Sequence, residues 1–265
     1  SGGSKTITLT TGSGFAIDNT TADMSKNASY AVIAPGRHSL RIRYWLRNTA
    51  DNPKGTIEGT VTKYVTLTFV PGSIHDVTAN LSINDYGGTN YYMWDAKENF
   101  WYGYEWNSAT PQQPTENNIT NSYYPKNSVS DPLRYYKETG YGTPPGRVDP
   151  TNSLFKSLPN VNEMIWYVKK GDPRWDYNEL WTTMGHLYKG GVWIKKAAVI
   201  AKDYAYWATP ATLKDAAPDG IDYRSNTPLS WTDADYSVMT RNTLPDASEA
   251  GNYFFLAPRG YYYGT

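Results

Sequence analysis

Aromatic residues are distributed very unevenly along this 265-residue chain. Of its 40 aromatic side chains (10 Trp, 24 Tyr and 6 Phe), 34 lie after residue 85, among them nine of the ten Trp. Aromatic side chains dominate the packing of the segments that contain them. A chain of this length folds as one large or two modest domains. The imbalance therefore predicts two domains, residues 1–85 and 86–265.

The first region alternates apolar and polar residues with a period of two, which is typical of half-buried strands. Pro-Gly turns separate the alternating segments. These segments are residues 6–10, 40–47, 61–69 and 74–83. Arginines occupy the polar positions of residues 40–47, and we expect that face to lie in water. The pattern predicts a small antiparallel β-sandwich over residues 1–85.

Two helices are predicted in the second region. Apolar residues recur at i, i+3, i+4 and i+7 from Val161 to Val168, with Gly171 as the residue that ends the helix. The same spacing runs from Tyr177 to Tyr188, before two glycines that would end a second helix.

The rest of the second region is predicted as strands and loops. Residues 192–201 and 253–256 are strongly apolar and predict strands, whereas residues 209–235 predict a loop. Residues 107–151 are Pro-rich and polar, but they contain enough Tyr and Leu to be pinned across a folded body. The expected fold is therefore a β-sandwich followed by a loop-rich α+β domain with two helices.

Charge and cysteine content exclude several classes of function. The 25 Lys and Arg residues balance the 25 Asp and Glu residues, so the chain has no excess charge for phosphate backbones or anionic lipid. No run approaches the roughly 18 apolar residues of a spanning helix. The absence of cysteine excludes disulfides, thiolate metal sites and a cysteine nucleophile. Residues 1–4 are expected to be a flexible leader outside the fold.

No catalytic motif surrounds the titratable residues. The three histidines, His38, His75 and His186, lie far apart and without a metal-binding partner at suitable spacing. Carboxylates from distant loops are the alternative route to a hydrolase. The candidates are Asp172, Asp176, Glu179, Asp233 and Asp235. Helix caps and turns explain these residues better, so we expect no enzyme activity.

Two acidic turns, residues 219–222 and 233–235, offer the oxygen ligands that calcium prefers. Neither follows the twelve-residue pattern of a calcium loop, and Asp-rich turns are common without a metal. We therefore expect no cofactor, with calcium as the open alternative.

The aromatic residues are the strongest candidates for recognition. Exposed Trp and Tyr rings stack on sugars and fill hot spots in protein interfaces, whereas buried rings form a core. Trp166 and Trp181 are expected in the core. The ligand-binding candidates are Trp94, Trp101, Trp106 and Trp175, together with the Tyr pairs at 123–124 and 135–136.

Three segments resemble the C-terminal region of fimbrillin-like surface lipoproteins, in order and in spacing. They are residues 158–167 (LPNVNEMIWY), 180–193 (LWTTMGHLYKGGVW) and 253–262 (YFFLAPRGYY). The first and last are also similar to FISUMP-type domains, which are related to the C-type-lectin and formylglycine-generating-enzyme folds. Met164 stands where those domains have Trp, and residues 256–258 read Leu-Ala-Pro instead of Leu-Pro-Ala. The resemblance covers residues 158–265, and residues 30–83 more loosely.

The resemblance implies a bacterial cell-surface protein, exported to the outer membrane, whose signal and lipid anchor lie outside this chain. It implies adhesion or fimbrial assembly without catalysis, with fimbrial subunits or surface glycans and proteins as partners. A lectin-like, glycan-binding module with an exposed aromatic loop face is the alternative. Fimbrillin-like sandwiches can accept a donated strand, so residues 5–10 are either such a strand or an ordinary first strand. The family continues beyond the Gly-Tyr strand, so a truncated C-terminus is expected.

Overall fold

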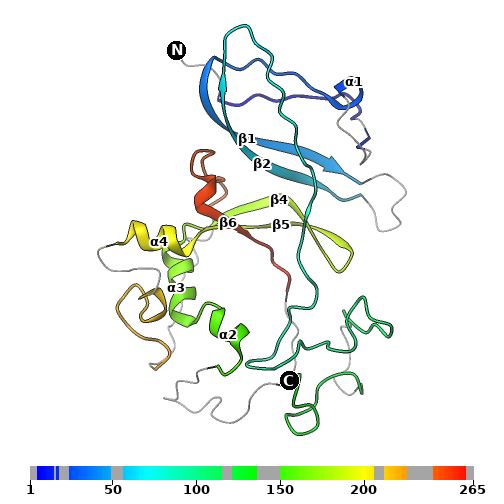
Figure 1. Cartoon of the computed structure of the whole chain (residues 1–265), viewed down its shortest axis with the longest axis vertical. Coiled ribbons are helices and arrows are strands. Elements are labelled where there is room, and N and C mark those ends of the chain that lie inside the picture. Colours follow the sequence, from blue (N-terminus) through cyan, green and yellow to red (C-terminus); the bar gives the residue numbers. More distant parts are fainter. Residues whose placement is uncertain are drawn as a thin grey trace.

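The computed structural model describes residues 5–14, 16–17, 24–48, 56–114, 121–135, 150–205, 212–225 and 241–260 (Figure 1). Strands and short helices follow one another along the chain. They are α1 (Met24–Asn27), β1 (Gly36–Arg47), β2 (Glu58–Phe69), β3 (Asn84–Asp85), α2 (Ser153–Ser157), α3 (Val161–Lys170), β4 (Arg174–Thr183), β5 (His186–Lys195), α4 (Ala197–Asp203), η1 (Thr212–Lys214), η3 (Ala250–Asn252) and β6 (Tyr253–Leu256). None of these described helices is long and apolar enough to cross a membrane.

Six strands form one mixed sheet in the order β1-β2-β4-β5-β6, with β3 paired to β4. β1 and β2 pair antiparallel along their whole lengths. β2 meets β4 through a single parallel pair, Thr60 beside Glu179. Helices α3 and α4 gather at one end of the β4–β5 hairpin (Figure 1). The architecture is α+β, as predicted for the second region.

The alternation in residues 40–47 and 61–69 is confirmed as β1 and β2. Residues 6–10 and 74–83 form no strand, because no described strand pairs with them and most of their apolar side chains lie in solvent. Ile74, for example, is 85% exposed. A separate N-terminal sandwich is not confirmed, since the described strands belong to a single sheet. The division at residue 85 stays a prediction.

The second predicted helix, residues 177–188, is wrong. These residues belong to β4 and β5, joined by the turn Met184-Gly185, whose φ angles are 50° and 71°. Two positive φ angles are typical of the type I′ turn that matches the twist of paired strands. Trp181 and Tyr188 are seven residues apart, as on a helix face, but they lie opposite each other across the hairpin with ring centroids 4.7 Å apart. The two glycines at 190–191 lie inside β5.

The first predicted helix and the last strand are confirmed. α3 follows Asn160, whose side-chain oxygen accepts a hydrogen bond from the third helical N–H at 3.0 Å, and it ends at Gly171. β6 coincides with residues 253–256. The strand predicted over residues 192–201 is correct only as far as Lys195, because α4 follows.

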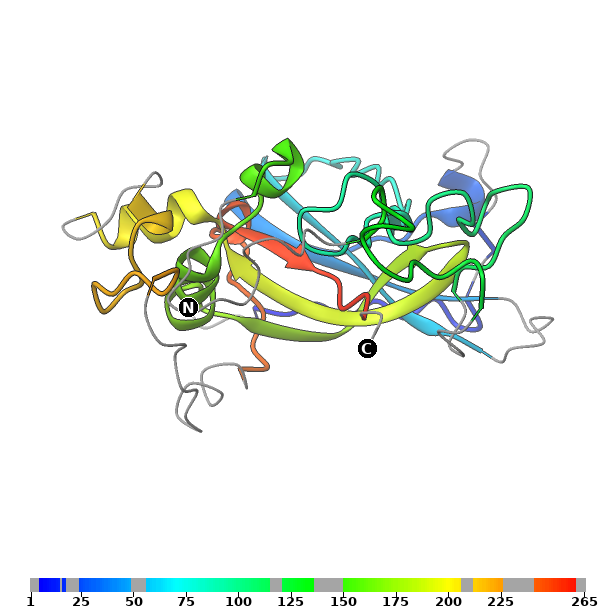
Figure 2. The ribbon, with the colours of Figure 1, turned by 90° about the horizontal axis from the view of Figure 1, so that it is seen from below.

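The helices and the loops have separate small cores. In the first core, Trp166 packs against Ile200, Ala201 and Leu213, as predicted for this tryptophan. In the second core, Phe100, Trp101 and Tyr124 pack together within the loops. Figure 2 shows the β4–β5 hairpin running between α3 and α4 on one side and the loops of residues 86–135 on the other.

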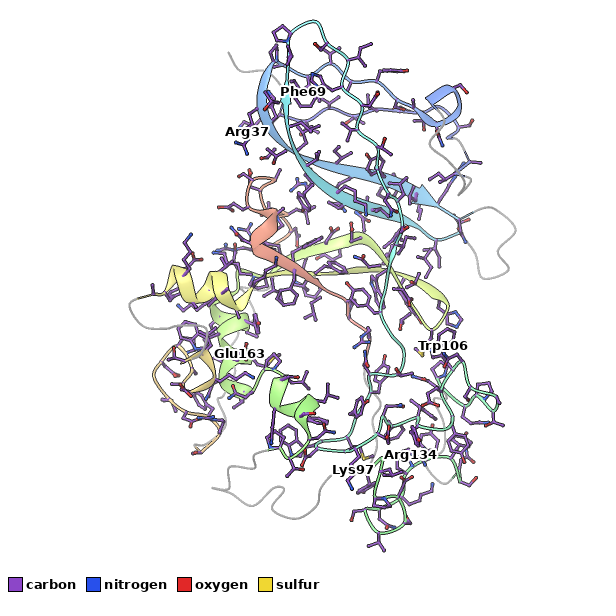
Figure 3. All side chains as sticks on the ribbon, viewed as in Figure 1. Arg37, Phe69, Lys97, Trp106, Arg134 and Glu163 are labelled. Carbon is purple, nitrogen blue, oxygen red and sulfur yellow. The ribbon has the colours of Figure 1, made fainter. Side chains whose placement is uncertain are left out.

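Residues 107–151 contain neither strand nor helix where the structure describes them, and their described parts contact the neighbouring loops. Arg134 lies buried among these loops (Figure 3) and donates a hydrogen bond to the carbonyl of Phe100 at 3.3 Å, and the Glu98 N–H donates to the carbonyl of Leu133 at 2.8 Å. Asp95 accepts hydrogen bonds from the backbone N–H groups of Thr151 and Asn152 at 2.9 and 2.8 Å. The long loop is therefore held near its middle and at its end.

Gly59 allows β2 to approach β4 closely. A Cβ atom there would lie 2.5 Å from Asn178 O and 2.7 Å from Leu180 Cδ2. We expect Gly59→Ala to lower the free energy of unfolding by about 1–3 kcal/mol, as other over-packing changes do. Gly251→Ala is the matched control, because nothing lies within 4 Å of an added Cβ. Denaturant unfolding followed by circular dichroism measures both variants, and equal midpoints would contradict the close approach.

Candidate functional site

The four candidate tryptophans, Trp94, Trp101, Trp106 and Trp175, do not form one surface. Trp101 is 0% exposed and belongs to the core with Phe100 and Tyr124, so a ligand at the surface cannot reach its ring. Trp94 is half-buried, with its ring centroid 5.4 Å from that of Phe155. These two tryptophans contribute to the packing of the loops.

Trp106 packs between the loops and the turn of the β4–β5 hairpin (Figure 3). Its indole covers Gly88, where an added Cβ would lie 2.9 Å from Nε1, and it lies close to Gly185 of the hairpin turn. Its backbone N–H donates to Gln113 Oε1 at 3.2 Å. The side chain is 37% exposed. Trp106 therefore packs mainly within the molecule and shows only part of its ring.

β4 brings Trp175 together with Tyr177. Their rings are nearly parallel, at 16°, with centroids 6.3 Å apart. Tyr177 begins the irregular stretch of β4 between Asp176 and Leu180, where the register with β5 shifts. Tyr177 is 60% exposed and Trp175 is half-buried. Sequence reasoning missed Tyr177 because it placed this segment on a helix.

A buried ion pair joins the two parts of the chain. Arg43 Nη2 of β1 lies 2.7 Å from Asp176 Oδ1 of β4, and the Asp176 side chain is 1% exposed. Trp193 Nε1 donates to the other carboxylate oxygen at 3.2 Å. The arginine face of β1 was predicted to lie in water. This prediction is wrong for Arg43, because its side chain contacts the buried Asp176. A buried carboxylate requires a cationic or hydrogen-bonding partner, and the guanidinium supplies it.

Glu179 completes this contact at the single pair between β2 and β4. Its Oε2 accepts hydrogen bonds from the hydroxyls of Thr62 and Thr60 at 2.6 and 3.2 Å, and its Oε1 accepts one from the Thr62 N–H at 3.0 Å. Burial raises the pKa of the Glu179 carboxyl, and the Thr62 hydrogen bonds reduce that rise. We call Arg43, Thr60, Thr62, Asp176 and Glu179 the buried joint. Its carboxylates hold strands together and offer no free base.

Asp172, another candidate for a carboxylate pair, is also fully engaged. It accepts hydrogen bonds from Arg174, Arg241 and the Tyr253 hydroxyl, each at 2.8 Å. Burial alone would raise the pKa of this carboxyl, but the hydrogen bonds from Arg174 and Tyr253 outweigh burial and lower it. Asp233 and Asp235 lie outside the described residues.

The acidic turn at residues 219–222 has protein partners. Asp222 Oδ1 accepts hydrogen bonds from Arg224 and Asn162 at 2.8 and 2.9 Å, and the Arg224 bond lowers the pKa of the carboxyl. Asp219 accepts a hydrogen bond from the Tyr223 hydroxyl at 2.8 Å. Within the described ranges, no three His, Asp or Glu side chains are grouped to hold a metal. The other acidic turn, residues 233–235, is not among them, so the calcium alternative stays open.

The histidines have ordinary surroundings, as expected. His38 Nε2 lies 2.9 Å from Ala34 O, and His75 Nε2 accepts a hydrogen bond from the Val70 N–H at 3.1 Å. His186 is exposed at the start of β5, not inside a helix.

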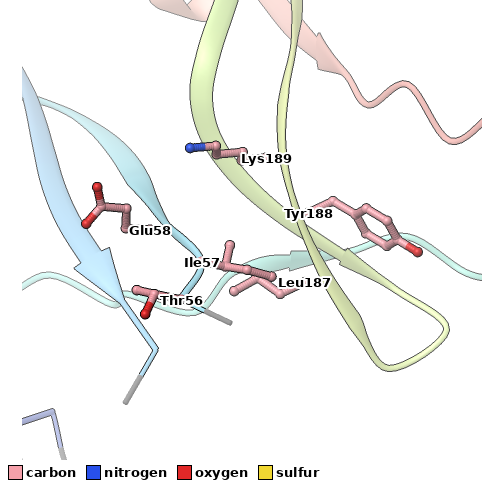
Figure 4. A pocket seen from close by; sticks show the side chains of 6 residues that line it. All are labelled: Thr56, Ile57, Glu58, Leu187, Tyr188 and Lys189. Carbon is pink, nitrogen blue, oxygen red and sulfur yellow. The ribbon is translucent and has the colours of Figure 1, made fainter. Parts of the chain in front are cut away.

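An open groove of about 490 Å³ lies between the start of β2 and the start of β5. Figure 4 shows Ile57 and Leu187 close together on its floor, while Lys189 points toward the wall that carries Glu58. Tyr188 points away from the groove (Figure 4). The groove is therefore lined by two side chains of opposite charge, Glu58 and Lys189, and by two apolar side chains, Ile57 and Leu187.

β1 forms one edge of the sheet, and its outer side is unpaired among the described residues. All 12 residues of β1 pair with β2, and no backbone hydrogen bond joins β1 to another described segment. Leu40, Ile42 and Tyr44 lie half-buried on the side of β1 that faces away from the buried joint. Nearby Val32 is 94% exposed. A long edge of this kind can pair with a strand from another chain.

We expect Arg43→Met to leave Asp176 buried without its cation. The unfolding free energy should fall by about 2–3 kcal/mol, less than for a fully buried pair because the Arg43 side chain is 27% exposed. Arg47→Met is the control, since this exposed arginine of the same strand has, among the described residues, one hydrogen bond, to Ser13 O at 3.3 Å. Urea unfolding measures both, and equal losses would contradict a special role for Arg43.

Glu179→Gln should reveal the raised pKa of Glu179. The folded state binds the Glu179 proton more tightly than the unfolded state, whose pKa is near 4.5, so stability falls as pH rises through the folded pKa. Glutamine keeps the shape without the charge, so we expect Glu179→Gln to be more stable than the parent at pH 7, with the difference shrinking at pH 4.

Thermal unfolding at both pH values measures this effect, with Glu58→Gln at the exposed start of β2 as control. A stability difference that grows toward pH 4 would contradict the assignment.

No family model matches the chain, and no curated protein and no solved structure matches it. The resemblance to fimbrillin-like proteins therefore stays a prediction based on the sequence segments alone.

Proposed function

We propose that this chain is a bacterial cell-surface protein without catalytic activity that acts in adhesion or in fimbrial assembly. Its partners are then other subunits, or glycans and proteins of a cell surface. Export to the outer membrane and a lipid anchor outside this sequence belong to the same proposal.

The outer edge of β1 is the observation that carries this proposal. It offers 12 residues of strand without an outer neighbour among the described residues, next to a half-buried apolar side. Strand addition at such an edge gains main-chain hydrogen bonds, and alternate side chains supply selectivity. Monomeric proteins usually protect such edges with charge or proline. β1 carries arginines at positions 37, 41, 43 and 47, so a partner strand has to accommodate these charges.

The proposal includes two features of the fold, a sandwich in the first region and a C-type-lectin-like second region. A strand supplied by a partner would extend the sheet beyond β1 and cover its apolar side, which brings the first region closer to the expected sandwich. A C-type-lectin-like second region is proposed from the sequence resemblance alone.

The alternative is glycan binding through the aromatic loops. The burial of Trp101 and the packing of Trp106 weigh against this loop face as the binding surface. Tyr177, which is 60% exposed and stacks on the half-buried Trp175, favours a different location for a glycan, on β4.

Leu40→Lys should block association at β1. It places a charge on the half-buried apolar side, whereas Ser39→Lys places the same charge on the opposite, exposed position of the strand. We expect the parent and Ser39→Lys to form larger species as concentration rises, and Leu40→Lys to stay monomeric with an unchanged circular dichroism spectrum. Light scattering after size exclusion measures this. A parent chain that stays monomeric throughout would contradict assembly through this edge.

A further inference from the structure

Arginine side chains line one face of β1. They stand at positions 37, 41, 43 and 47, and they alternate with the half-buried apolar side of the strand. Among the described residues, Arg43 is the one arginine of β1 that forms an ion pair, with Asp176 of the buried joint. The other three arginines are exposed. β1 therefore presents positive charge beside the same edge that lacks an outer neighbour.

The neighbouring strand β2 places an acid opposite only one of these exposed arginines. Glu58 lies opposite Arg47. Arg37, in contrast, lies opposite a threonine, and Arg41 lies opposite a tyrosine. Arg37 and Arg41 are thus two exposed cations, four residues apart on one face of the strand, with no acid opposite them on β2.

The contact of Arg41 with the loop before β6 is made to a neutral oxygen. Its Nη1 donates a hydrogen bond to the Pro245 carbonyl at 2.7 Å. The carboxylate of the next residue, Asp246, accepts hydrogen bonds from the Ser248 N–H and hydroxyl at 2.9 and 2.7 Å instead. A guanidinium has five N–H donors and binds a carboxylate well, so Arg41 keeps donors for an anionic partner.

We propose that the strand which adds to β1 carries two acidic residues four positions apart, with apolar residues at the positions that face the other way. Opposite charges directly across a strand pair are favourable, and like charges are unfavourable. The two acids then lie on the face of Arg37 and Arg41, and the apolar residues cover the side of Leu40 and Ile42. Charge on β1 thereby selects the partner strand.

A second copy of β1 does not fit this description. If two copies of β1 paired antiparallel about Ile42, Arg37 of one copy would lie opposite Arg47 of the other. Arg41 would lie opposite Arg43 in the same way. These like charges disfavour the pairing, so a second copy of the chain has to offer a different segment.

This inference rests on the strand addition proposed above and names the chemistry of the added strand. The test measures the binding of three labelled peptides to the full chain by fluorescence anisotropy. All three alternate valine with threonine. The first carries aspartate at two of the threonine positions, four residues apart. In the second, one of these aspartates is moved by one position, which turns it to the valine face. The third has asparagine in place of both aspartates.

We expect the first peptide to bind about tenfold more tightly than the other two, with a difference that shrinks at high salt. Arg37→Gln should weaken the first peptide about threefold and leave the asparagine peptide unchanged. Lys63→Gln is the matched control, because it removes the same charge from the opposite face, where Lys63 lies across from Ile42. Thermal unfolding of both variants checks that each remains folded.

The outcomes separate this inference from the proposed function. Equal binding of the three peptides, or a preference that Arg37→Gln leaves intact, would overturn the inference while supporting strand addition. If no peptide binds but the parent chain associates and Leu40→Lys stays monomeric, the inference fails and assembly through β1 stands. If no peptide binds and the chain does not associate, both fail.

Discussion

The ion pair between Arg43 and Asp176 is the contact on which the arrangement of the sheet depends. The backbones of β2 and β4 pair through one residue pair only. Main-chain hydrogen bonds alone would therefore hold the β1–β2 hairpin only weakly to the β4–β5 hairpin. A buried carboxylate without a partner is strongly unfavourable. Asp176 therefore requires the hairpin that carries Arg43, and Glu179 requires the hydroxyls of Thr60 and Thr62. Gly59 makes this possible, since β2 approaches β4 where it has no side chain.

This joint leaves the outer edge of β1 free for a partner. It turns the polar side of β1 and β2 toward β4, so the outer edge of β1 and its apolar side remain on the periphery. It also occupies only one face of the β4–β5–β6 strands, whereas Trp175, Val192 and Leu256 lie on the other. Two of the carboxylates considered for a hydrolase, Asp176 and Glu179, build this joint.

Local signals predicted much of the fold, and nonlocal contacts explain what they missed. Strict alternation predicted β1 and β2, and helical spacing after Asn160 predicted α3. The β4–β5 hairpin was mistaken for a helix because Trp181 and Tyr188 are spaced as on a helix face. Trp175 was among the candidates, but its partner Tyr177 was hidden by that error. Arg43 and Asp176 are 133 residues apart, and no local pattern links them.

Amide hydrogen exchange along β1, resolved by residue with NMR, tests the central claim most directly. If the joint leaves the outer edge of β1 free, alternate residues of Gly36–Arg47 have outward N–H groups and exchange fast, while the residues between them are protected together with β2. Uniform protection along the whole strand would contradict the account, because it would mean that the outer edge is already paired.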